Sequence, residues 1–108
     1  LDTPALLIDL SLLEENLTLM AAYFKKCGTE LRPHFKTHKS PVIAHKQLEA
    51  GAIGITCAKL DEAQVLVEAG IKNILLANQI VGEKKSRRLL GLNRHSDTHD
   101  PRKVTYVP

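Results

Sequence analysis

Short apolar runs alternate along this chain with longer stretches in which apolar side chains recur every three or four residues. The short runs are typical of buried strands, and the longer stretches are typical of amphipathic helices. The pattern therefore predicts strands over residues 3–10, 29–35, 52–57 and 71–77. It predicts helices after Ser11, Ser40 and Leu60 and over about residues 80–90.

Capping signals support these helix boundaries. Ser11 and Glu14 fit a capping box, and Ser40-Pro41 combines a cap with a proline at the first helical position. Asp61 and Glu62 suit the positive end of the next helix dipole. We expect Gly28, Gly51, Gly70 and Gly91 to end the four helices.

These glycines recur about every 20 residues, which indicates repeated strand–helix units and a parallel sheet. Two α/β architectures fit at this point: an open doubly wound sheet, or the opening units of a (β/α)8 barrel. No Gly-x-Gly-x-x-Gly follows a strand, so the dinucleotide-binding fingerprint is absent from the sequence.

Composition narrows the class of protein. The chain has 108 residues, which is enough for one small domain or part of a larger one, and its first residue is Leu, so we expect a fragment. Its net charge of +3 lacks a continuous basic stripe, which argues against nucleic-acid binding. No apolar run predicts a membrane span or a signal peptide. Two cysteines without metal spacing favour a reducing, cytoplasmic setting.

The densest chemistry lies in residues 31–41, where a predicted strand meets a helix. Parallel α/β folds place their active sites at such junctions. A partly desolvated lysine at a strand end, close to another cation, is a good nucleophile toward aldehydes, and Lys36 fits this description. A solvated basic loop is the alternative. His34 alternates with Phe35 on the strand, which favours a packing or orienting role for His34.

Other candidates are weaker. Arg32 is expected to pair with a carboxylate or hold an anionic group, and Cys57 is expected to be buried. His95, Asp97, His99 and Asp100 are metal-ligand types, but we assign no metal site to them. The periodic pattern ends after Asp97, so residues 98–108 are expected to be a divergent, disordered tail.

The run from Leu31 to Ser40 resembles the Arg-Pro-His-x-Lys-Thr-His-Lys signature of the D-threonine aldolase and eukaryotic-type D-serine dehydratase family. These are alanine racemase-like, fold-type III enzymes that use pyridoxal phosphate. The opening run at 2–9, the run at 51–63 and the run at 69–82 are also similar to this family.

The resemblance implies that residues 1–97 are the first part of a (β/α)8 barrel, the TIM barrel of the alanine racemase N-terminal domain. Residues 1–10 would form a strand of a C-terminal β-domain that is missing from the chain. By position, Lys36 matches the lysine that binds the cofactor as a Schiff base, with Lys39 as the runner-up and His34 as a further cofactor-binding residue. The family's divalent metal would be bound outside this chain.

The function implied is a lyase acting on D-β-hydroxy-α-amino acids, which in an aldolase gives glycine and an aldehyde. D-Serine dehydratase is the second candidate and a racemase the third, while a non-catalytic pyridoxal phosphate-binding protein remains open. The resemblance also implies a homodimer for the full protein. We expect the chain alone to bind cofactor poorly and to be inactive.

Overall fold

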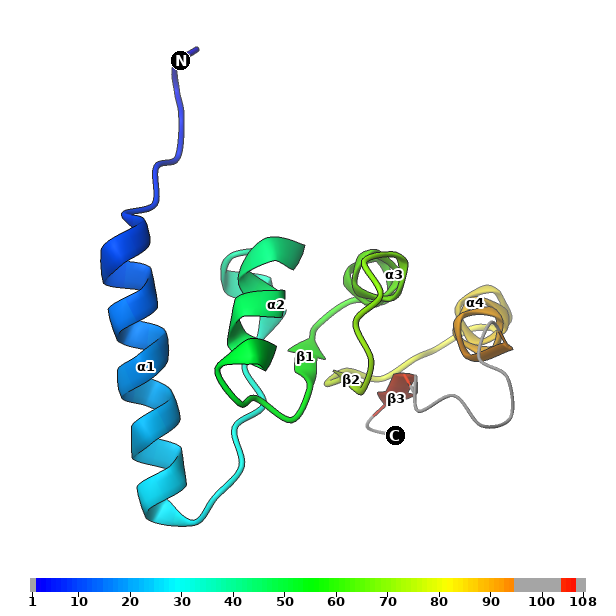
Figure 1. The fold of residues 1–108 in the computed structure, drawn as a ribbon. Helices are drawn as coiled ribbons and strands as arrows, with labels where there is room; N and C mark the ends of the chain where they lie inside the picture. The colour runs from blue at the N-terminus through cyan, green and yellow to red at the C-terminus, as the bar shows by residue number, and fades with distance from the viewer. Residues whose placement is uncertain (1, 95–103, 107–108) are drawn as a thin grey trace.

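The computed structural model describes residues 2–94 and 104–106. Figure 1 shows these elements in chain order. They are α1 (Leu10–Cys27), the 3₁₀ turn η1 (Phe35–Thr37), α2 (Pro41–Glu49), β1 (Ile55–Cys57), α3 (Leu60–Glu68), β2 (Ile74–Leu76), α4 (Glu83–Arg94) and β3 (Val104–Tyr106).

The described strands form a parallel sheet in the order β1–β2–β3. Ile55 pairs with Ile74, and Ile74 pairs in turn with Val104. A parallel bridge between His34 and Thr56 adds the segment before η1 to the other side of β1. The α/β class and the parallel βα repeats predicted from the sequence are therefore confirmed.

The helices cover one face of this sheet. In Figure 1, α2, α3 and α4 follow one another along the same side of the strands. Ile55 and Cys57 are buried on that side, while Thr56 between them is only half-buried, as the alternation of side chains in a strand requires. The main core combines this face of the sheet with α3 and includes Ala63 and Leu66.

The predicted strand over residues 3–10 is absent. Residues 2–9 lie outside any helix or strand, and the Leu6, Leu7 and Ile8 side chains are exposed. A strand needs a neighbour to satisfy its backbone N–H and C=O groups, and these residues have none among the described parts of the chain. Figure 1 shows them extending away from the rest of the molecule.

The start of the first helix also differs from the prediction. Asp9, rather than Ser11, is the N-cap, and its Oδ1 accepts a hydrogen bond of 3.1 Å from the Leu12 N–H. Asp is as good a cap as Ser, so the helix can begin directly after Asp9. The apolar run before Asp9 stays outside the helix. The other helix starts agree with prediction: Ser40 caps α2, whose first residue is Pro41, and Asp61 and Glu62 lie in the first turn of α3.

The predicted strand over 29–35 is reduced to two hydrogen bonds and one bridge. The Ile53 N–H donates to Leu31 and the Thr56 N–H donates to Pro33. Pro33 has no N–H to donate in return, and the chain then turns into η1, so a regular ladder does not form.

Two predictions nearer the C-terminus are wrong. Gly91 does not end a helix but lies inside α4, which runs to Arg94. Residues 104–106 are not disordered, because Val104–Tyr106 pair with the exposed edge of β2, and the Val104 side chain is buried. The rest of the predicted tail, and the His95–Asp100 group, lie outside the described residues.

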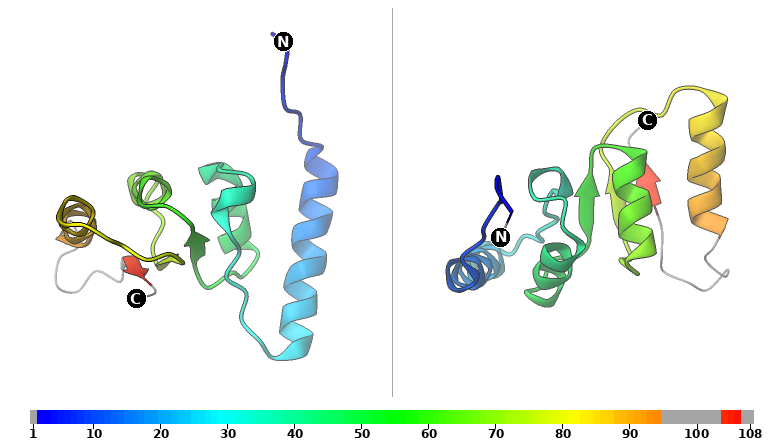
Figure 2. Two further views of the ribbon diagram at one scale, coloured as in Figure 1. Left: turned by 180° about the vertical axis from the view of Figure 1, so that it is seen from behind. Right: turned by 90° about the horizontal axis from the view of Figure 1, so that it is seen from above.

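The chain is more open than a closed domain. Its radius of gyration is 15.3 Å, compared with about 13 Å expected for a compact domain of this length. Helix α1 stands apart from the sheet in both views of Figure 2, and none of its side chains is fully buried. No helix in the described part of the chain is long and apolar enough to cross a membrane.

Candidate functional site

Polar residues follow the strands at the carboxyl edge of the sheet. Lys36 follows the His34 bridge, Lys59 follows β1, and Asn78 follows β2. The Asn78 Nδ2 group donates to the Ala58 carbonyl over 3.2 Å, which joins the loops after β1 and β2. Because the strands are parallel, all these groups lie at the same edge.

His34 and Lys36 are joined through the backbone. The Lys36 N–H donates to His34 Nδ1 over 3.2 Å, so a neutral His34 ring carries its proton on Nε2. Burial and the Lys36 charge lower the pKa of His34, and the Glu62 charge acts in the opposite direction. His34 pairs in register with Thr56 and Leu75, so it lies on the sheet face away from the helices.

The Lys36 side chain is exposed. Among residues 2–94 and 104–106, no hydrogen bond or ion pair holds its amine. Phe35 beside it is only 2% exposed, so the alternation expected for His34 and Phe35 is confirmed. The buried Phe35 ring anchors the short turn from which Lys36 projects.

His38 shapes the other end of this loop. Its Nδ1 accepts a 3.1 Å hydrogen bond from the Ser40 N–H, and its ring meets Phe35 edge to face at 5.4 Å. Its Nε2 is buried and has no hydrogen-bond partner in the described part of the chain. Burial lowers the pKa of His38, while Gln47 and the Ser40 backbone oppose this shift.

Lys39 differs from Lys36 in its surroundings. Its Nζ lies 3.9 Å from Glu62 Oε1, and its backbone has φ +50°, a left-handed conformation that is uncommon for a residue with a Cβ. The Glu62 carboxylate is buried, and its Oε2 also accepts hydrogen bonds from the Ala58 and Lys59 N–H groups at 2.8 and 3.3 Å. Sequence reasoning assigned Glu62 only a favourable interaction with the helix dipole and missed its contact with the lysine motif.

Arg32 has neither of the partners expected from the sequence. Its Nη1 donates to the Asn73 carbonyl and to Asn73 Oδ1, each at 2.9 Å. Asn73 precedes β2, so this contact lies at the amino edge of the sheet, opposite Lys36. Arg32 is therefore a structural residue in the described chain.

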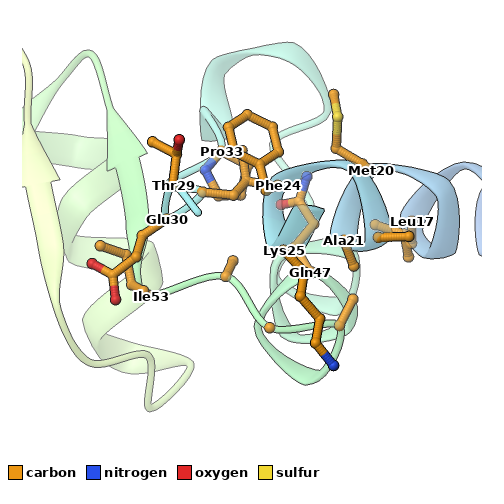
Figure 3. A pocket seen from close by; sticks show the side chains of 15 residues that line it. Leu17, Met20, Ala21, Phe24, Lys25, Thr29, Glu30, Pro33, Gln47 and Ile53 are labelled. Carbon is orange, nitrogen blue, oxygen red and sulfur yellow. The ribbon is translucent and has the colours of Figure 1, made fainter. Parts of the chain in front are cut away.

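A cavity of about 580 Å³ lies elsewhere, between α1 and the segment 29–33. Figure 3 shows Met20 and Phe24 from α1 on one side of it and Ile53 on the other. Its lining is mostly apolar and includes neither Lys36, Lys39 nor His34. It is a gap in the packing of α1 and is distinct from the polar carboxyl edge.

The described residues offer no group of three or more His, Cys, Asp or Glu side chains that could hold a metal ion. Cys57 is fully buried, as expected, and burial and the Glu62 charge raise the pKa of its thiol to about 12. Lys36, Lys39 and His34 therefore remain the candidate site residues at the carboxyl edge.

A row of parallel strands, joined by helices and with polar residues at its carboxyl edge, fits the opening part of a βα-barrel domain. The chain belongs to the family of the alanine racemase N-terminal domain, a TIM barrel family, whose model matches residues 8–95. Membership implies pyridoxal phosphate as the cofactor.

Known relatives agree with this assignment. The chain is 48% identical over 84 residues to a D-threonine aldolase of an Arthrobacter species, covering 78% of this chain and 22% of that protein. The structure of D-threonine aldolase from Filomicrobium marinum matches with a TM-score of 0.88 and 43% identity, over 97% of this chain and 27% of that one. D-threo-3-hydroxyaspartate dehydratase from a Delftia species matches with a TM-score of 0.81 and 40% identity, over 89% and 25%. The chain thus spans about a quarter of the length of these relatives.

Proposed function

We propose that this chain is the cofactor-lysine portion of a pyridoxal phosphate-dependent lyase that acts on D-β-hydroxy-α-amino acids, as a D-threonine aldolase does. The observation that carries the proposal is the exposed Lys36 amine, which has no ion-pair partner in the described chain and lies at the carboxyl edge of a parallel sheet. Active sites of βα-barrels lie at this edge.

The residues present fit the cofactor. An amine that forms a covalent bond with an aldehyde must be accessible and must be able to lose its proton, and a carboxylate beside it would oppose that loss. Lys36 is accessible and has no such neighbour within ion-pair distance, whereas Lys39 has Glu62. We therefore assign the covalent bond to Lys36 and keep Lys39 as the alternative.

The roles of this chain's residues follow from their positions. Lys36 would hold the cofactor aldehyde through its amine and accept or return a proton there. When bound, pyridoxal phosphate withdraws electrons from the substrate's Cα. His34, fixed by the Lys36 N–H, presents its Nε2 on the sheet face that becomes the barrel interior. Its lowered pKa keeps the ring neutral near pH 7.

A dehydratase is the second candidate. The chain is 46% identical over 77 residues to the D-threo-3-hydroxyaspartate dehydratase of a Delftia species, close to its identity with the aldolase. Retro-aldol cleavage and β-elimination both start from an amino acid held on the cofactor. The described residues hold the cofactor lysine but no group that selects between the two reactions.

The proposal extends to the whole protein. The exposed Leu6, Leu7 and Ile8 and the apolar gap beside α1 support further barrel strands and a β-domain that would cover them. Residues 1–97 would then be a partial barrel domain that is inactive by itself. The solved structure of a dehydratase mutant is described as metal-free. We propose that a divalent metal and a homodimer complete the active protein, in the cytoplasm, with metal ligands outside this chain.

The experiment compares Lys36→Ala and Lys39→Ala in the protein extended to its relatives' length. We expect Lys36→Ala to abolish D-threonine cleavage, by about 10³-fold or more, and Lys39→Ala to retain most of it. Lys72→Ala, at an exposed residue on the opposite edge, is the matched control. Full activity of Lys36→Ala would contradict the proposal.

A further inference from the structure

Glu62 is a buried acid without a part in the chemistry described so far. Its side chain is 9% exposed, and it is the charged residue buried in the described core. A buried carboxylate is stable only when hydrogen-bonded or paired. Two backbone N–H groups from the loop after β1 and the Lys39 amine fulfil this requirement.

The same contact constrains Lys39. Its backbone N–H donates to the Phe35 carbonyl over 2.8 Å, and its φ of +50° departs from the preferred regions. The strained backbone directs the Lys39 side chain toward the start of α3, where Glu62 lies. Strained residues of this kind gather at functional sites. The Lys36 amine, three residues earlier, is not held by any acid in the described chain.

We propose that Glu62 is a positioning residue that holds the Lys39 amine at the start of α3, turned away from the cofactor aldehyde, so that Lys36 is the amine that reacts. This inference rests on the proposed function. The selectivity matters because the two lysines lie on one short loop, and either amine is chemically capable of the bond.

The bond itself is the same at both lysines. The unprotonated amine nitrogen attacks the aldehyde carbon, the aldehyde oxygen leaves as water with two protons from the amine, and a carbon–nitrogen double bond forms. Borohydride then adds hydride to that carbon and fixes the cofactor on the lysine. A Lys39 amine held against the Glu62 carboxylate must leave that contact before its nitrogen can reach the aldehyde carbon, so the contact disfavours reaction at Lys39.

The experiment maps the borohydride-fixed cofactor by peptide mass spectrometry in the protein extended to its relatives' length. The variants are Lys36→Ala, and Lys36→Ala with Glu62→Gln. Gln still accepts the Ala58 and Lys59 hydrogen bonds but carries no charge. Asp61→Asn in the same background is the matched control, since Asp61 is an exposed acid on the same helix turn and pairs with Arg88 at 2.7 Å.

We expect the original protein to carry the label on Lys36. Glu62→Gln should raise labelling of Lys39 about two- to fivefold over Lys36→Ala alone, the range for an ion pair with one exposed partner. Asp61→Asn should leave it unchanged. Label on Lys36 in the original protein, together with no gain at Lys39 when Glu62→Gln is added to Lys36→Ala, would overturn this inference and leave the proposed function intact.

A second measurement does not need the cofactor. Competitive acetylation of the apo protein compares the reactivity of the two amines directly, and Glu62→Gln should raise that of Lys39 relative to Lys36 by a similar factor. An unchanged ratio would overturn the inference. Absence of label from Lys36 in the original protein would instead overturn the proposed function.

Discussion

The Arg32 guanidinium donates from Nη1 to both the backbone carbonyl oxygen and the side-chain Oδ1 of Asn73, each 2.9 Å away. Asn73 Nδ2 donates in turn to the Ile53 carbonyl over 2.6 Å. This Arg32–Asn73 clasp joins three neighbouring chain segments at the amino edge of the sheet. It holds the amino ends of the βα units together, while Lys36 lies at the opposite, carboxyl edge of the sheet.

Gly54 makes the clasp possible. A Cβ at this position would overlap Arg32 Nη1 and the Asn73 carbonyl oxygen. We therefore expect Gly54→Ala to destabilise the chain by about 1–3 kcal/mol, the range for overpacking a buried position. Urea unfolding followed by circular dichroism measures this change.

Gly91→Ala is the matched control for that substitution. Gly91 lies in α4 with open space around its Cβ position. Alanine there should stabilise the helix by about 0.5–1 kcal/mol. Equal stability of the Gly54→Ala chain and the original chain would show that the clasp does not need a glycine.

The stability of the fold should depend on two histidines. Burial lowers the pKa of both His34 and His38 from 6.5, so the unfolded chain takes up protons at a higher pH than the folded chain does. Stability should then be fully present above about pH 6.5 and fall as the pH drops below it. Urea midpoints between pH 7.5 and 5.5 measure the slope.

The pH slope can be traced to its source with variants. Replacing His34 and His38 together by Gln should flatten the dependence between pH 7.5 and 5.5. A double variant that loses stability over this interval as steeply as the original chain would refute the role of the two imidazoles.

The two thiols should differ in reactivity. Cys27 is exposed, whereas Cys57 is buried with its pKa raised to about 12. Because the thiolate is the reactive form, a thiol-specific disulfide reagent should label about one thiol per folded chain. The second thiol should react only in denaturant.

A Cys27→Ser chain isolates the buried thiol. It should stay unlabelled while folded and react once urea unfolds it. Rapid labelling of that chain under native conditions would mean that the strand β1 is not covered as described.

The sequence predicted the elements that depend on local signals. Ser40-Pro41 starts α2 as expected, and Gly28 and Gly70 follow their helices with positive φ. The strands over 52–57 and 71–77 were recognisable from their apolar runs, although the ladders are shorter, at Ile55–Cys57 and Ile74–Leu76.

The differences from prediction share a physical cause. A strand forms only where another segment pairs with it, and the partner expected for residues 3–10 belongs to a β-domain outside this chain. Conversely, Val104–Tyr106 has no periodic hydrophobic pattern, yet it forms a strand because it pairs with the open edge of β2. The regular spacing of glycines predicts that Gly91 ends a helix. In the structure Gly91 lies inside α4, where its backbone does not adopt the left-handed conformation that ends a helix.

The site was only partly predictable. The motif identified Lys36, Lys39 and His34 as candidates, because they lie together in the sequence. The Glu62 contact joins Lys39 to a residue 23 positions later (62 − 39), and only the packing of α3 against β1 brings them together. The Arg32–Asn73 contact spans 41 positions and was hidden for the same reason.

The most direct test of the central claim is an absorbance spectrum of the protein with added pyridoxal phosphate, before and after borohydride. It should be recorded for the 108-residue chain and for the protein extended to its relatives' length. The account predicts a band near the visible edge in the extended protein that borohydride abolishes, leaving the cofactor fixed to a peptide containing Lys36. A fixed cofactor on any other lysine, or no band in the extended protein, would contradict it.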